Sequence, residues 1–244
     1  MKKHRLLSLF LSFALLLPLF ASFSAEAYED FTLDARAGLL IEADTGEILY
    51  EKNAHQENYP ASLTKIMTAL LVFEAIDEGK LSLSDSITAT ESAFEGLSSD
   101  GSTADIVPGE TMTVEQLLNC MLIVSANETC NILGEYISGS VEAFVARMNE
   151  RATELGCEHT HFANATGLHN SQHYTTAWDL YLITREAMKH EKFMEICNSK
   201  SYTVPATNMT EKPRELHSTN FLISNWRARG YVYRDAQGIK TGST

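Results

Sequence analysis

The sequence has 244 residues, of which 44% are hydrophobic, and a formal net charge of −13 at pH 7. This length is sufficient to bury one large core or two small ones. So acidic a surface repels phosphate backbones and argues against nucleic acid as a partner.

The N-terminal segment has the layout of a secretory signal peptide. Cations at positions 2, 3 and 5 precede an apolar run over residues 6–23 and the small-residue site Ala25-Glu26-Ala27. An uncleaved anchor is the alternative, since the run is nearly long enough to span a bilayer, but Pro18 and the small-residue site favour cleavage. We therefore expect residues 1–27 to be a signal peptide. Residues 28–244, whose net charge is −15 once three cations and one anion are removed, are then expected outside the cytoplasm.

The first predicted elements are a hairpin and a helix. Residues 38–43 and 47–50 are strand-like and flank the turn-forming sequence Asp44-Thr45-Gly46. From Ser62, apolar residues recur at helical spacing until Gly79, which predicts a largely buried helix with Ser62 at its start. Residues 96–109 are rich in Ser, Gly and Asp and are predicted to form a surface loop.

Helices are predicted over much of the segment between residues 113 and 190. Thr113 and Gln116 have the spacing of a capping box ahead of a helix that ends near residue 124. Another begins around residue 127, a third covers 141–155 and ends at Gly156, and a fourth covers 176–190.

Short strands are predicted at residues 202–204, 221–223 and 238–242. The order of hairpin, helices and strands indicates an α/β fold. We expect an antiparallel sheet with strands from both ends of the chain, rather than repeated βαβ units.

The sequence Ser62-x-x-Lys65 places a hydroxyl and an amine one helical turn apart. A neutral lysine there can take the serine proton, and burial or a nearby cation can lower its pKa from the usual ~10.4. The start of a helix also stabilises a developing alkoxide. The pattern alone is common on helix surfaces, but the apolar residues around it favour a catalytic pair.

Ser125-Ala126-Asn127 falls at the break between two predicted helices, where a hydroxyl and an amide can face a cleft. An ordinary helix N-cap is the alternative for Asn127. Residues 218–220 repeat the Ser-x-Asn pattern, and we interpret that second match as a surface turn.

Lys240-Thr241-Gly242 lies on the last predicted strand. Its cation and hydroxyl suit a carboxylate, and its glycine lets a ligand approach the backbone closely. Taken alone, the same sequence also fits a strand that ends in a turn.

Together and in this order, these three motifs resemble those of penicillin-binding proteins and serine β-lactamases. Residues 59–65, the turn at 44–46, the block 160–168 and Asp179 further resemble the low-molecular-mass D-alanyl-D-alanine carboxypeptidases, serine peptidase family S11. The resemblance covers residues 36–244. It implies a β-lactamase/transpeptidase-like fold, with an antiparallel sheet flanked by helices and an all-helical subdomain.

The resemblance implies that Ser62 attacks the bond between two D-alanines of a peptidoglycan pentapeptide and forms an acyl-enzyme. Lys65 is then the base and Ser125 the proton relay, while Asn127, Lys240, Thr241 and Gly242 bind substrate. The backbone N–H groups of Ser62 and Ser243 form the oxyanion hole. The family needs no cofactor or metal, and β-lactams inhibit it.

In that family, strands and a helix follow the Lys-Thr-Gly strand, and many members carry a further domain and a membrane-binding segment. Residues 28–244 are therefore expected to be an incomplete catalytic domain. We expect few sheet partners for residues 238–244 and a poorly folded or inactive fragment, because an unpaired strand leaves backbone groups unsatisfied.

Three other interpretations remain. A class A β-lactamase would carry a Glu-x-x-Leu-Asn element, and no such sequence follows Asn127. A zinc enzyme is suggested weakly by Cys157-x-His159-x-His161 and by His169 with His173, but no His-Glu-x-x-His occurs. A non-catalytic binding module is the third. The four cysteines, at 120, 130, 157 and 197, are either core residues or disulfide-bonded in one of three pairings.

Overall fold

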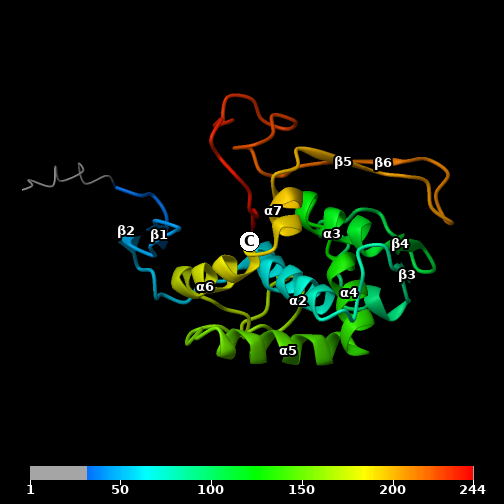
Figure 1. The fold of residues 1–244 in the computed structure, drawn as a ribbon, viewed down its shortest axis with the longest axis horizontal. Coiled ribbons are helices and arrows are strands. Elements are labelled where there is room, and N and C mark those ends of the chain that lie inside the picture. Colours follow the sequence, from blue (N-terminus) through cyan, green and yellow to red (C-terminus); the bar gives the residue numbers. More distant parts are fainter. Residues whose placement is uncertain (1–31, 244) are drawn as a thin grey trace, which may run out of the picture. The chain divides into compact units, whose positions relative to one another are not determined.

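The computed structural model describes residues 32–243, so the predicted signal peptide lies outside the described residues. From Arg36 onwards the chain forms one compact unit (Figure 1). Among the described residues, no helix is both long and apolar enough to cross a membrane.

A buried helix lies at the centre of this unit. Residues 65–73 of α2 (Lys65–Asp77) are all buried, as expected for a helix that is apolar on every side. Around α2 pack four other helices, which are α3 (Val114–Ile123), α4 (Glu128–Ser138), α5 (Val141–Glu154) and α6 (Ala177–Ala187). The predicted buried helix is therefore confirmed (Figure 1).

The start of this helix is tighter than predicted. Residues Ala61–Thr64 form a 3-10 helix, η2, in which the Leu63 N–H donates to Pro60 O at 3.1 Å. Ser62 therefore lies in a 3-10 turn ahead of α2, where the first N–H groups have no intrahelical acceptor.

The predicted helix ends match their capping residues. The side chains and backbones of Thr113 and Gln116 form the predicted capping box of α3. Gly156, just beyond α5, has a left-handed φ of +83°, the conformation that glycine adopts at little cost. The fourth predicted helix ends early, at Ala187, and α7 (Glu191–Cys197), which was not predicted, packs on α3.

The described strands form three separate antiparallel pairs, so within residues 32–243 the expected sheet that joins strands from both ends of the chain is not formed. β1 (Gly38–Ile41) and β2 (Ile48–Lys52) are the predicted hairpin. β5 (Ser201–Val204) contains the predicted strand at 202–204, and pairs with β6 (Arg214–His217). β3 (Ser86–Thr88) and β4 (Thr111–Thr113), on either side of the loop and of a short 3-10 helix, η3 (Ser92–Phe94), were not predicted.

Two predicted strands are wrong. Residues 221–223 form a turn, because Asn220 O accepts from Ile223 N and Ser224 N at 3.2 and 3.0 Å. Residues 238–242 have no regular structure. Within residues 32–243 no strand lies beside them to satisfy a ladder, so the expectation of few sheet partners is confirmed.

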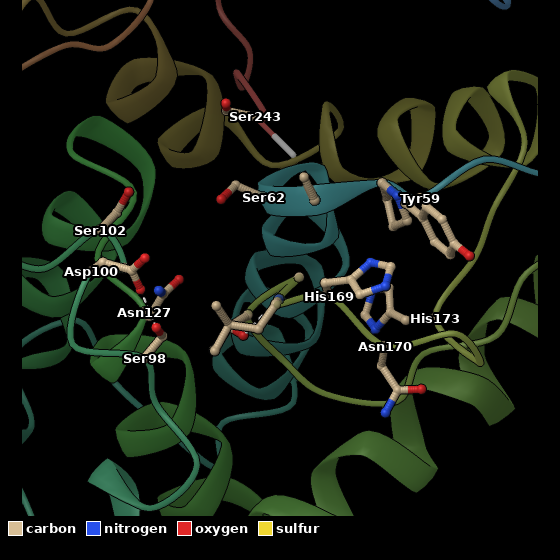
Figure 2. A pocket seen from close by; sticks show the side chains of 16 residues that line it. Tyr59, Ser62, Ser98, Asp100, Ser102, Asn127, His169, Asn170, His173 and Ser243 are labelled. Atoms are coloured by element: carbon tan, nitrogen blue, oxygen red, sulfur yellow. Dashed lines mark hydrogen bonds between the residues drawn. The ribbon is translucent and has the colours of Figure 1, made fainter.

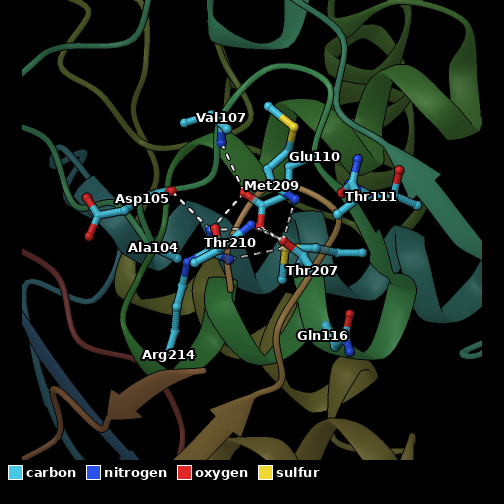
Figure 3. A network of polar contacts seen from close by, with 12 residues as sticks. Ala104, Asp105, Val107, Glu110, Thr111, Gln116, Thr207, Met209, Thr210 and Arg214 are labelled. Atoms are coloured by element: carbon cyan, nitrogen blue, oxygen red, sulfur yellow. Dashed lines mark hydrogen bonds and ion pairs between the residues drawn. The ribbon is translucent and has the colours of Figure 1, made fainter. Parts of the chain in front are cut away.

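A buried ion pair fixes the β5–β6 ribbon to the loop before β4 (Figure 3). Arg214 Nη2 lies 2.7 Å from the carboxylate oxygens of Glu110, whose side chain is fully buried. Thr207 Oγ1 donates to the same carboxylate at 2.6 Å. Removing either charge would leave the other buried and unpaired, which costs about 3–5 kcal/mol.

All four cysteines are free thiols; Cys120, Cys130 and Cys197 are core residues, whereas Cys157 is half-buried at the edge of the core. Burial raises the pKa of Cys120, Cys157 and Cys197 to about 12 and that of Cys130 to about 11. These thiols are therefore protonated at neutral pH, and poor nucleophiles.

Candidate active site

Lys65 is fully buried and points back toward Ser62. Its Nζ donates to Ser62 Oγ at 3.2 Å, to Asn127 Oδ1 at 2.8 Å and to Thr166 O at 2.6 Å. Burial lowers the pKa of Lys65, and the nearby negative charge of Glu128 opposes that shift. The arrangement favours the neutral amine that a general base requires.

A loop that sequence reasoning assigned no role supplies the third acceptor of Lys65. Asn164 Oδ1 accepts from Thr166 N at 3.2 Å, from Thr166 Oγ1 at 3.0 Å and from Gly167 N at 2.7 Å. Asn164 Nδ2 donates to Leu168 O at 2.9 Å. One amide side chain thus closes the loop and fixes the direction of the Thr166 carbonyl.

Gly167 brings this loop directly against the backbone of Ala61 and Ser62. Its φ is +88°, and a Cβ placed there would lie 1.8 Å from Ala61 O. Only glycine fits so close an approach at a left-handed φ. Ala61 itself has a φ of +48°, so the backbone is strained on the residue before Ser62.

His173 also supports the start of α2 and was not predicted to do so. The Ala163 N–H donates to its Nδ1 at 3.1 Å, so Nε2 carries the proton and donates to Thr64 Oγ1 at 2.7 Å. Burial, with the charge of His161, lowers the pKa of His173 to about 4. The ring is therefore neutral at pH 7 and serves as a fixed donor.

Asn127 opens α4, but its side chain is not an N-cap. Its Oδ1 accepts from Lys65, and its backbone N–H donates to Ser102 O at 2.9 Å, which brings in the surface loop. The N-cap interpretation is therefore wrong, and the structure brings Asn127 together with Ser62 and Lys65.

Ser125 has a strained backbone and an unpaired side chain. Its φ is +67°, a conformation that non-glycine residues seldom adopt. Its Oγ is buried and has no hydrogen-bond partner, and the three hydrogen-bond contacts of Lys65 Nζ are to Ser62, Asn127 and Thr166. A buried hydroxyl without a partner costs about 1–3 kcal/mol of folding free energy. The Ser125 hydroxyl, two residues before Asn127, is therefore free to donate to, or accept from, a bound ligand.

Gly242, the last residue of the Lys-Thr-Gly motif, lies against η2. A Cβ on Gly242 would be 3.2 Å from Pro60 O and 3.3 Å from Leu63 Cγ, which leaves little room for a side chain. Burial and the charge of Lys65 lower the pKa of Lys240 to about 7. Its Nζ donates to Thr241 O at 2.9 Å. In the described residues this cation has no carboxylate partner in an ion pair.

A cavity of about 620 Å³ opens beside Ser62 and Asn127 (Figure 2). Ser62, Asn127 and Ser243 line it, together with the loop at 98–102 and residues 166–170. Ser125, Lys240 and Thr241 are not among its lining residues. Asp100 is its one lining carboxylate, and a hydrogen bond from Ser98 lowers the pKa of that group.

The residues that suggested zinc do not form a cluster. His159 N donates to Asp179 Oδ2 at 2.9 Å, and its Nδ1 lies 3.3 Å from Glu57. Within the described range, no three His, Cys, Asp or Glu side chains are placed to hold a metal ion.

Comparisons with known proteins agree with this geometry. Residues 23–244 match the family model described as D-alanyl-D-alanine carboxypeptidase. The chain is 38% identical over 225 residues to D-alanyl-D-alanine carboxypeptidase DacF of Bacillus subtilis, covering 92% of this chain and 55% of that protein. To DacC of Escherichia coli it is 32% identical, with 91% and 54% covered. The chain thus spans about half the length of these curated relatives.

Solved structures show the same fold. The Streptomyces K15 DD-transpeptidase superposes with a TM-score of 0.79 at 30% identity, over 89% of this chain and 83% of that one. DacD of Francisella tularensis gives 0.68 at 33% identity, over 84% and 49%. The expected β-lactamase/transpeptidase-like α/β fold is confirmed, and the chain belongs to the D-alanyl-D-alanine carboxypeptidase family.

Proposed function

We propose that this protein is a serine-type D-Ala-D-Ala carboxypeptidase that removes the terminal D-alanine of a peptidoglycan stem pentapeptide. One observation carries the proposal. In a member of this family, the fully buried Lys65 lies 3.2 Å from Ser62 Oγ at the edge of an open cavity.

The hydrogen bonds of Lys65 suit a neutral base. A neutral amine keeps two N–H donors and one lone pair, and Asn127 Oδ1 and Thr166 O are the two acceptors. The lone pair is then directed at Ser62, whose hydroxyl donates to it. As Ser62 Oγ bonds to the scissile carbonyl carbon, its proton passes to Lys65 Nζ.

The negative charge of the tetrahedral intermediate falls on the former carbonyl oxygen. We assign its stabilisation to the backbone N–H groups of Ser62 and Ser243, both of which line the cavity. When the C–N bond breaks, the proton on Lys65 passes through Ser125 to the departing D-alanine nitrogen. The unpaired Ser125 hydroxyl supports this relay role. Water then hydrolyses the acyl-enzyme.

Substrate binding is divided between two sides of Ser62. Because Lys65 occupies Asn127 Oδ1, Asn127 contributes its Nδ2 as a donor to the substrate backbone. Lys240 and Thr241 bind the terminal carboxylate, and Gly242 and Ser243 leave room for its backbone. A buried lysine without an ion-pair partner gains most from an anionic ligand.

We expect penicillin to be released slowly. Among residues 32–243, Asp100 supplies the one carboxylate that lines the cavity, and none of these residues places a glutamate there as a base resembling that of class A β-lactamases. β-Lactams are therefore proposed as inhibitors rather than substrates.

We place the mature protein on the extracytoplasmic side of the bacterial membrane, facing the cell wall. The signal-peptide layout of residues 1–27 supports export. Membrane association through a C-terminal segment, as in many members of the family, belongs to the same proposal.

Covalent labelling tests the proposed function. A labelled penicillin is expected to form a stable adduct that peptide mass mapping places on Ser62, and the protein is expected to release D-alanine from a pentapeptide. Ser62→Ala removes both results, whereas Ser199→Ala, whose hydroxyl donates to Glu195 O at the end of α7, keeps both. An adduct on any other residue would disprove the assignment of the nucleophile.

A further inference from the structure

The second Ser-x-Asn sequence, interpreted above as a surface turn, connects the two halves of the site. Ser218 is buried, and its N–H donates to Lys200 O at 2.9 Å. The Thr219 N–H donates to Ile123 O at 3.2 Å, at the end of α3 and two residues before Ser125. The turn is thus fixed to the helix that leads into Ser125-x-Asn127.

The side chains of the same turn hold the Lys240 segment. Asn220 Nδ2 donates to Gly238 O at 2.6 Å, and Thr219 Oγ1 lies 2.7 Å from Thr241 Oγ1. Asn220 Oδ1 is itself fixed by the Leu222 N–H at 3.0 Å. No described strand pairs with residues 238–242, so these side-chain hydrogen bonds hold the segment together with the packing of Ile239 on the core and of Gly242 on Leu63.

When a carboxylate is bound, the donor and the acceptor of the hydrogen bond between Thr219 and Thr241 are fixed. A carboxylate only accepts hydrogen bonds, so Thr241 must donate its single hydroxyl proton to it. The contact to Thr219 then persists only if Thr219 donates to Thr241 Oγ1. In that arrangement Thr219 fixes the rotamer of Thr241 and keeps its proton for the ligand.

We propose that Thr219 is a positioning residue for the carboxylate-binding hydroxyl of Thr241. The inference rests on the proposed function and deepens it, because it assigns a specific role in recognising the terminal carboxylate. Thr219 does not touch the reacting atoms, so its loss affects binding of the carboxylate rather than acyl transfer.

Two substrates separate this role from a merely structural one. The first is an N-acyl-D-Ala-D-Ala peptide, and the second is an N-acyl-D-alanine thioester whose leaving group carries no carboxylate. Thr219→Val removes the hydroxyl at nearly constant shape. We expect it to raise KM for the peptide about 2- to 10-fold, as for the loss of one hydrogen bond, with kcat changed less than twofold. Both parameters for the thioester stay unchanged.

Two variants serve as controls. Thr219→Ser keeps the hydroxyl and is expected to restore the peptide KM to within twofold of the parent. Thr203→Val removes a matched hydroxyl that donates to Glu215 Oε1 at 2.9 Å on the exposed side of β5, and is expected to change neither substrate. Thermal unfolding of each variant identifies any loss of folded protein.

The outcomes are distinct. An unchanged peptide KM in Thr219→Val, or an equal change for peptide and thioester, would overturn the positioning role alone. Failure of Thr219→Ser to restore KM would also overturn it, since the serine retains the donor. If the unsubstituted protein forms no penicillin adduct on Ser62 and releases no D-alanine, the proposed function falls, and this inference with it.

Discussion

The two lysines of the site are held in different ways. Lys65 begins a helix whose first nine residues are all buried, and its hydrogen bonds end on elements next to that helix. Lys240 lies on a segment without regular structure that side chains tether to the turn at 218–220. In the proposed mechanism, activation of Ser62 therefore depends on the helical core, whereas binding of the substrate carboxylate depends on a few separable contacts.

Lys65→Arg tests the first half of this comparison and has the largest expected effect. Arginine stays protonated at any working pH, so it cannot accept the Ser62 proton. We expect the rate of acylation by labelled penicillin to fall about 10²- to 10⁴-fold, the usual contribution of a general base. Lys189→Arg, at an exposed ion pair with Glu186, is the matched control and should acylate at the parent rate. A fall of less than tenfold in Lys65→Arg would exclude the lysine as base.

Gly167→Ala tests whether the close packing of Gly167 against Ala61 positions Ser62. The added Cβ would meet Ala61 O at 1.8 Å and take a left-handed φ, so we expect a loss of about 2–4 kcal/mol in the free energy of unfolding. Displacement of Ser62 should also slow acylation about 100-fold. Urea unfolding and the rate of adduct formation measure the two effects.

Gly156→Ala is the control for backbone strain alone. Its φ is +83°, but nothing lies within 4 Å of the added Cβ. We expect a loss of about 1–2 kcal/mol and no change in acylation. Equal acylation rates in the two glycine variants would show that the contact with Ala61 does not position Ser62.

The pH dependence of KM tests the proposed role of Lys240 in binding the carboxylate, and its expected effect is the smallest. With a pKa of about 7 in the free protein, Lys240 loses its proton as the pH rises above that value. We therefore expect KM for the carboxylate peptide, relative to that for the thioester, to rise up to about tenfold per pH unit above 7. Taking the ratio cancels the titration of Lys65. Lys240→Arg should abolish the rise, and the same rise in that variant would assign it to another group.

Much of the helical part follows from local sequence. The capping box of Thr113 and Gln116 and the glycine after α5 act over a few residues, so their pattern suffices to place helix ends. The strands predicted at 221–223 and 238–242 are absent, because a strand, unlike a helix end, depends on residues that are distant in sequence. A strand needs a partner strand. Instead, Asn220 accepts hydrogen bonds from Leu222, Ile223 and Ser224, and its Nδ2 donates to Gly238 O in the other segment.

The site residues that belong to sequence motifs could be predicted from the sequence. Ser62 and Lys65 meet as their spacing suggested, and Asn127 joins them as the family resemblance implied, although Ser125 makes no bond to Lys65. His173 was not predictable because its partner Thr64 lies 109 residues away in sequence. Asn164 bonds only within its own loop, but the Thr166 carbonyl that it orients accepts from Lys65, 101 residues away, and local sequence does not reveal that contact. The resemblance of residues 160–168 to a family block was the one available signal for Asn164.

The four free cysteines of the folded protein are expected to react slowly with alkylating reagents. With pKa values near 11 or 12, they carry almost no thiolate at neutral pH, and alkylating reagents attack the thiolate. A cysteine becomes reactive only when the surrounding structure opens and its pKa returns toward ~8.5. The alkylation rates of Cys120 on α3 and Cys130 on α4 therefore measure how often the helical core around Lys65 opens.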